Sequence, residues 1–108
     1  MSFRRRPPMA TMHHTSRVYL EVPVVAPESI TLNAQTVEMS LVAYGTDPGA
    51  WTAAQWHPTQ DADSERDAIL LVGEGSPTEL LPGTYSVWVR ISDNPERPVL
   101  HAGGLRVT

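Results

Sequence analysis

The sequence shows an alternation of apolar and polar residues with a period of two, which limits the folds open to the chain. It is clearest over residues 85–92, where one face would carry Tyr85, Val87, Val89 and Ile91. Residues 17–25 and 37–44 alternate in the same way. Successive side chains of a strand point to opposite faces, so such stretches are typical of half-buried strands. No stretch shows a convincing helical period, and we therefore predict an all-β chain.

Turn-forming residues separate these stretches at short intervals. Gly45–Gly49 and Asp93–Pro98 are rich in glycine, proline and aspartate, which favour turns. Ile69–Val72 is a continuous apolar run and predicts a buried strand. Residues 30–32, 51–57 and 99–108 are expected to be extended, the last with a bulge at Gly103 and Gly104.

About seven short strands separated by turns predict a small antiparallel β-sandwich of immunoglobulin-like type, with a small barrel as the alternative architecture. Such sandwiches often bury a tryptophan on their third strand, and Trp56 is the candidate. Pro82 and Gly83 precede Tyr85 at a corner, where its ring can pack inward while its hydroxyl caps a backbone group. The cysteine pair of antibody domains is absent, so this likeness is one of architecture only.

The length of 108 residues fits one domain. Residues 1–16 are expected to form an extended basic N-terminal arm, because Pro7-Pro8 disfavours helix, and residues 17–108 to form the sandwich. The chain has no cysteine, which excludes disulfides and thiolate metal sites. No segment approaches the roughly 20 apolar residues that span a bilayer, and no signal peptide is recognisable, so we expect synthesis in the cytoplasm and no membrane partner.

Charge is distributed unevenly. Residues 1–17 contain four arginines and no acid, whereas residues 18–108 contain four arginines and twelve acids. A basic segment on an acidic body is typical of interaction tails, although a solvated chain end has the same composition. The candidate partner-binding arginines are Arg4, Arg5, Arg6 and Arg17. We expect them to pair with carboxylates of a partner, or of a second copy, rather than with nucleic acid, because the body is acidic.

Catalytic and metal-binding patterns are weak. His13 and His14 are adjacent and would point apart on an extended chain, and the two remaining histidines are distant in sequence. Acidic residues alternate over 61–67, but without the glycine and spacing of a calcium loop. No nucleophile elbow, phosphate loop or dinucleotide fingerprint is present. We expect no enzymatic activity and no cofactor.

Two tryptophans are candidates for binding. Trp88 lies on the face opposite Tyr85 and Val87, where a lone sandwich would expose its ring unless an arm or loop covers it. Trp51 is a similar candidate. Exposed tryptophans are frequent at protein interfaces and can also stack on sugars, which leaves a carbohydrate-binding or adhesion module as the alternative function.

From Val42 onward the chain resembles short structural proteins of tailed bacteriophages from GC-rich bacteria. The resemblance rests on the turn at residues 45–48, the Trp51 to Trp56 spacing, residues 81–99 and residues 102–107. It implies a non-enzymatic virion component, either capsid decoration or head-to-tail connector, made in the host cytoplasm. The implied partners are capsid, portal or connector subunits and copies of the chain itself. No catalytic residue is implied.

Overall fold

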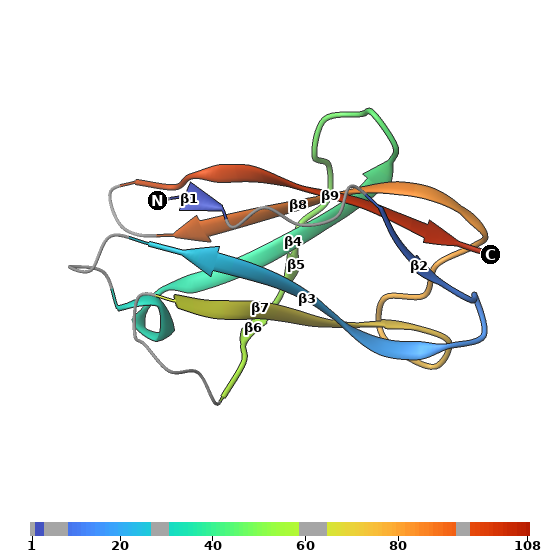
Figure 1. Ribbon diagram of the computed structural model, residues 1–108, viewed down its shortest axis with the longest axis horizontal. Helices are drawn as coiled ribbons and strands as arrows, with labels where there is room; N and C mark the ends of the chain where they lie inside the picture. The colour runs from blue at the N-terminus through green and yellow to red at the C-terminus, as the bar shows by residue number, and fades with distance from the viewer. Residues whose placement is uncertain (1, 4–8, 27–30, 59–64, 93–95) are drawn as a thin grey trace.

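The protein is described by a computed structural model that covers residues 2–3, 9–26, 31–58, 65–92 and 96–108. Its strands form two sheets that pack as a sandwich (Figure 1). The four-stranded sheet contains, in spatial order, β1 (Ser2–Phe3), β3 (Arg17–Val25), β7 (Glu65–Gly73) and β6 (Gln55–Trp56). The five-stranded sheet contains β2 (Met9–Met12), β9 (Val99–Val107), β8 (Gly83–Ser92), β4 (Thr36–Ala43) and β5 (Thr52–Ala53).

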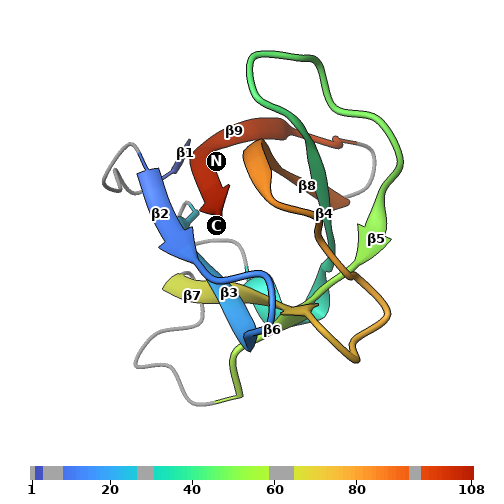
Figure 2. The same ribbon diagram turned by 90° about the vertical axis from the view of Figure 1, so that its right-hand side faces the viewer.

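All strand pairs are antiparallel except β2 with β9, which is parallel. Viewed end-on, β3, β7 and β6 form one layer and β9, β8 and β4 the other, with β2 along the side between them (Figure 2). The predicted all-β sandwich is confirmed, as are the long strands expected from the alternating stretches. The longest pairings are β3 with β7 in the four-stranded sheet, and β8 with both β9 and β4 in the five-stranded sheet.

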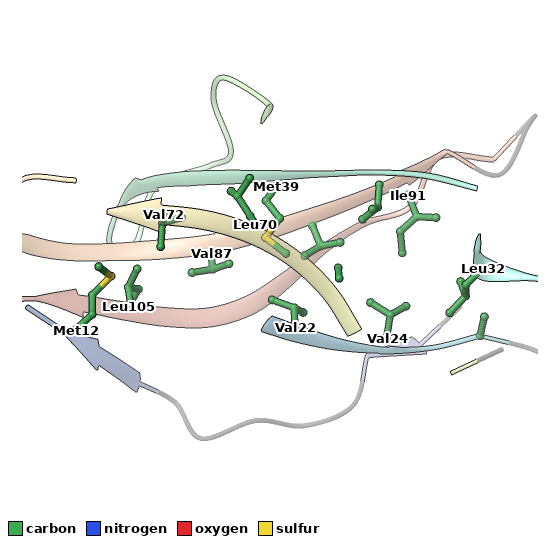
Figure 3. Packing of buried hydrophobic residues seen from close by; sticks show 14 of the residues in the cluster. Met12, Val22, Val24, Leu32, Met39, Leu70, Val72, Val87, Ile91 and Leu105 are labelled. Carbon is green, nitrogen blue, oxygen red and sulfur yellow. The ribbon is translucent and has the colours of Figure 1, made fainter. Parts of the chain in front are cut away.

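The core fills the space between the two sheets (Figure 3). The inward face predicted for residues 85–92 is confirmed, since Val87, Val89 and Ile91 are at most 3% exposed. Met39 on β4 is fully buried, and β7 contributes Val72. Burial of each such side chain stabilises the fold by about 1.5–3 kcal/mol. The core is therefore built from strand positions whose alternation is visible in the sequence.

Three local features differ from the expectations. Leu32 is not extended but begins a 3-10 turn, η1 (Leu32–Ala34), and its side chain is fully buried. Residues 51–57 form two short strands, β5 and β6, which belong to different sheets, with Ala54 between them. Trp56 was expected to be buried on the third strand of the sandwich. It lies instead on β6, an edge strand of the four-stranded sheet, where it is half-buried and packed against the core.

The N-terminal segment is built into both sheets where it is described. β1 pairs with β3, and β2 pairs with β9. Met12 at the end of β2 is 9% exposed and belongs to the core cluster. Met9–Met12, expected in the arm, is thus a strand of the sandwich instead. Arg4, Arg5, Arg6 and the Pro7-Pro8 pair lie outside the described residues.

Two glycines have specific backbone roles. Gly73 ends β7 with a φ of 110°, and a side chain there would meet the Ser16 carbonyl oxygen, which lies 1.9 Å from the ideal Cβ position. The β8–β9 register shifts between Val87 and Trp88, opposite Gly103, whose φ is 129°. The predicted bulge in the final strand is confirmed.

Candidate interaction surface

The loop between β4 and β5, residues 44–51, folds over the outer face of the five-stranded sheet. Two serines hold it there: the Gly49 N–H donates to Ser40 Oγ (3.1 Å) and the Gly45 N–H to Ser86 Oγ (2.9 Å). Both serines are only 1% exposed, although each lies on the outward-facing side of its strand. The loop therefore has fixed anchor points on the sheet (Figure 2 shows it rising from the end of β4).

Trp88 lies beneath the same loop. Its indole Nε1 donates to the Thr46 carbonyl oxygen at 3.2 Å, and its ring centroid lies 4.8 Å from that of His101, the residue opposite on β9. The side chain is half-buried. The sequence left open whether the Trp88 ring is exposed or covered by an arm or loop, and the structure shows it partly covered by a loop.

Trp51, Arg90 and Glu38 form a stacked cluster beside Trp88. Arg90 and Glu38 are cross-strand partners on β8 and β4, and both Nε (3.0 Å) and an Nη (2.8 Å) of the guanidinium donate to Glu38 Oε1. The guanidinium carbon lies 4.5 Å from the ring centroid of Trp51, a distance suited to a cation–π contact. The Arg90 and Glu38 side chains are 22% and 25% exposed.

We call the surface formed by Glu38, Trp51, Trp88, Arg90 and His101 the tryptophan face. Sequence reasoning identified its two tryptophans but missed the ion pair. The sequence does contain a signal for this ion pair, because Glu38 and Arg90 have opposite charges and both occupy outward-facing positions of their strands. Their pairing depends on the register of two strands that are far apart in the chain, and the alternation alone does not set that register.

Tyr85 lies at the corner that leads into β8. Its hydroxyl donates to the Leu81 carbonyl oxygen at 2.6 Å, and its half-buried ring packs against the core. Pro82 and Gly83 form the corner itself and are exposed, Gly83 with a φ of 156°. A phenol bound to a backbone carbonyl a few residues upstream matches the tyrosine corner of Greek-key sandwiches.

The remaining candidates are dispersed over the described residues. Arg17 is exposed at the start of β3, away from the tryptophan face, with its guanidinium beside Gly75. His14 Nδ1 lies 2.8 Å from the Thr108 carbonyl oxygen. No group of three or more histidine or acidic side chains in the described part of the chain could hold a metal ion, and Asp61 and Asp63 lie outside it. No helix among the described residues is long and apolar enough to span a membrane.

The outer face of the four-stranded sheet has a second apolar region that sequence reasoning did not single out. Tyr19 is 57% exposed there and lines two shallow hollows, of about 280 and 400 Å³, together with Gln55 and Ile69. The available signal was the position of Tyr19 on the polar face of an alternating strand, where a large aromatic ring is unexpected.

Comparison with known proteins identifies no relative: no family model, no curated protein and no solved structure matches the chain significantly. What the protein does must therefore be inferred from its own residues and their arrangement.

Proposed function

We propose that this chain is a non-enzymatic structural protein of a tailed bacteriophage particle. It is associated with the head, as capsid decoration or head-to-tail connector, and it is made in the host cytoplasm before assembly. It binds neighbouring capsid, portal or connector subunits through its N-terminal segment and through the tryptophan face. The proposal joins the resemblance of residues 42–108 to phage structural proteins with the geometry of this surface.

The sheet order supports an immunoglobulin-like sandwich. If β1, β3, β7 and β6 correspond to strands A, B, E and D of that fold, the order A-B-E-D follows. β9, β8, β4 and β5 then correspond to G, F, C and C′ of the variable type. Such domains present rigid sheet faces and end loops on which binding surfaces are built.

The observation that carries the proposal is the Glu38–Arg90–Trp51 cluster. Tryptophan and arginine are the residue types most enriched at the energetic centres of protein interfaces. Here the arginine is already held by a carboxylate and an aromatic ring, so little side-chain freedom would be lost when a partner covers it. A pre-ordered surface of this kind suits a subunit that must dock in one orientation.

The N-terminal segment supports the same role. Arg4, Arg5 and Arg6 lie in sequence between β1 and β2. These two strands belong to different sheets, because β1 pairs with β3 and β2 with β9. Three successive arginines are suited to pairing with the carboxylates of an acidic neighbour.

The tryptophans weigh against the carbohydrate-binding alternative. Sugar stacking needs an open ring face, and the Arg90 guanidinium lies over one of the two faces of Trp51. Trp88 is half-buried, and its indole N–H is already bonded to Thr46.

Incorporation of variants into particles tests the proposal. Four tagged proteins would be supplied during particle production: wild type, Trp51→Ala, Arg90→Ala and the control Arg106→Ala. Thermal melts would first confirm that each of them is folded. Arg106 is exposed on β9, away from the cluster. We expect wild type and control to enter purified particles and the two cluster variants to be reduced at least about tenfold, as loss of an interface centre predicts. Equal incorporation of all four, or exclusion of wild type from particles, would overturn the proposal.

A further inference from the structure

Within the part of the chain that the structure describes, no strand pairs with the outer edge of β3 over residues 17–23. Among the described residues, β3 pairs on that side only with β1, at Val24 and Val25, whereas β7 follows its other side along the full length. Val18 and Tyr19 within this stretch are 43% and 57% exposed. Such an edge presents N–H and C=O groups that can bind another strand.

The hydrogen bonds of β7 show which groups of β3 face this edge. His57 N–H donates to the Asp67 carbonyl oxygen at 2.8 Å, so that carbonyl points toward β6 and away from β3. Pro23 is opposite Asp67 and therefore belongs to a pair that exchanges no hydrogen bond. The backbone of Pro23 faces the open edge, where the missing N–H of proline is tolerated.

The other end of the strand has the same orientation. Gly73 N–H donates to the Thr78 carbonyl oxygen at 2.8 Å, away from Arg17, which is opposite Gly73. Backbone groups alternate in direction along a strand, so Arg17, Tyr19 and Glu21 all direct their N–H and C=O toward the open edge.

We propose that β3 pairs with β3 of a second copy of this chain, antiparallel and with Tyr19 opposite Tyr19. In this register Arg17 of each copy lies opposite Glu21 of the other. All three positions direct their backbone groups to the edge, and each opposed pair exchanges two hydrogen bonds, so the ladder contains about six. The pairing joins the two four-stranded sheets into one continuous sheet.

Charge complementarity selects this register. Arg17 and Glu21 lie on one face of β3 but four residues apart, about 13 Å, too far to pair within one copy. Neither makes an ion pair within the part of the chain that the structure describes. A register centred on Glu21 would place the Glu21 carboxylates of the two copies opposite each other. A register centred on Leu20 would place Pro23, which has no N–H, opposite Arg17. The Tyr19-centred register alone among these gives two Arg–Glu pairs flanking an aromatic pair, each a stabilising cross-strand contact.

This self-association goes beyond the proposed role in a phage particle and does not depend on it. It uses the edge of the four-stranded sheet, whereas the tryptophan face lies on the other sheet. Failure of one proposal would leave the other standing.

Sedimentation velocity over a range of concentrations tests the dimer. We expect wild type to dimerise, and Arg17→Glu and Glu21→Arg each to raise the dimer dissociation constant about tenfold or more, because two attractive pairs become repulsive. The double variant Arg17→Glu/Glu21→Arg exchanges the charges and is expected to restore wild-type association. A wild-type monomer at every concentration, single variants that dimerise normally, or a double variant that stays monomeric would each overturn the proposal.

Cysteine cross-linking tests the register. The chain has no cysteine, so a single introduced thiol can form only an intermolecular disulfide. In the proposed register Tyr19→Cys opposes its own copy at a Cα separation of about 5.5 Å, within disulfide range. Arg17→Cys and Glu21→Cys place their copies about 13 Å apart. We expect rapid oxidation to a covalent dimer for Tyr19→Cys alone; equal cross-linking of all three folded variants, or none in Tyr19→Cys, would contradict the register.

Discussion

The ion pair at the centre of the tryptophan face can be measured directly by a double-mutant cycle. The perturbations are Glu38→Ala, Arg90→Ala and both together. The cycle isolates the interaction between the two side chains because losses that each substitution causes independently cancel.

The expected coupling follows from the geometry. Two guanidinium N–H groups donate to one carboxylate oxygen, at 2.8 and 3.0 Å, and the side chains are 22% and 25% exposed. Fully exposed pairs contribute about 0.2–1 kcal/mol. Breaking a fully buried pair costs about 3–5 kcal/mol. We therefore expect a coupling of about 1–2 kcal/mol, since this pair lies between those limits.

The single substitutions are expected to differ. Arg90→Ala also removes the contact with Trp51, so it should cost about 0.5–1 kcal/mol more than Glu38→Ala. Urea unfolding followed by tryptophan fluorescence and circular dichroism gives the four free energies. The matched control is Glu38→Ala with Arg106→Ala, where Arg106 is opposite Thr84, six residues from Arg90 along β8. That pair should be additive within about 0.5 kcal/mol.

A coupling free energy below about 0.5 kcal/mol, no larger than that of the control pair, would contradict this expectation. It would mean that the pair is screened by solvent and that the tryptophan face is not pre-ordered. The coupling should also weaken in 1 M salt only in part, because burial limits screening.

Three further substitutions, one of them with a matched control at a second glycine, test separate parts of the fold. Tyr85→Phe should lower the free energy of unfolding by about 1 kcal/mol, because it removes the hydroxyl bond to the Leu81 carbonyl; no change in urea midpoint would show that the bond is not kept in solution. Gly73→Ala should cost about 3 kcal/mol or prevent folding, given its positive φ and the Ser16 carbonyl at its Cβ position. Gly45→Ala, with a positive φ but open space around it, should cost less, and equal losses would argue against the clash. Met12→Ala should cost about 2–3 kcal/mol, seen as a melting temperature lower by about 8–12 °C; an unchanged value would mean that β2 does not contribute to the core.

The parts of the fold that could be predicted are those encoded by local alternation. Residues 17–25 and 85–92 form the strands expected of them, and Val87 and Val89 point inward as their spacing requires. A period of two reports directly which side chains share a face, so it predicts both the strand and its buried side.

What could not be predicted depends on contacts between distant segments. Ser40 and Ser86 occupy outward-facing positions of their strands, but the loop between β4 and β5 covers them, and local alternation cannot indicate such coverage. The parallel pairing of Met9–Met12 with β9 joins the two ends of the chain, and nothing in the local pattern of either segment indicates its partner. Likewise, the two tryptophans of the tryptophan face could be found in the sequence, whereas the ion pair beside them depends on the register of β4 and β8.

The proposed place in a phage particle can be tested by mass spectrometry of purified particles from the source culture. Trypsin cleaves after lysine and arginine, and residues 67–90 contain no lysine and no arginine before Arg90. Trypsin should therefore release residues 67–90 as one peptide. We expect to recover this peptide from particles, near the stoichiometry of the capsid protein for a decoration protein or at a few copies for a connector. Absence of the peptide from particles, with the protein present in the cells or medium, would contradict the assignment to the virion.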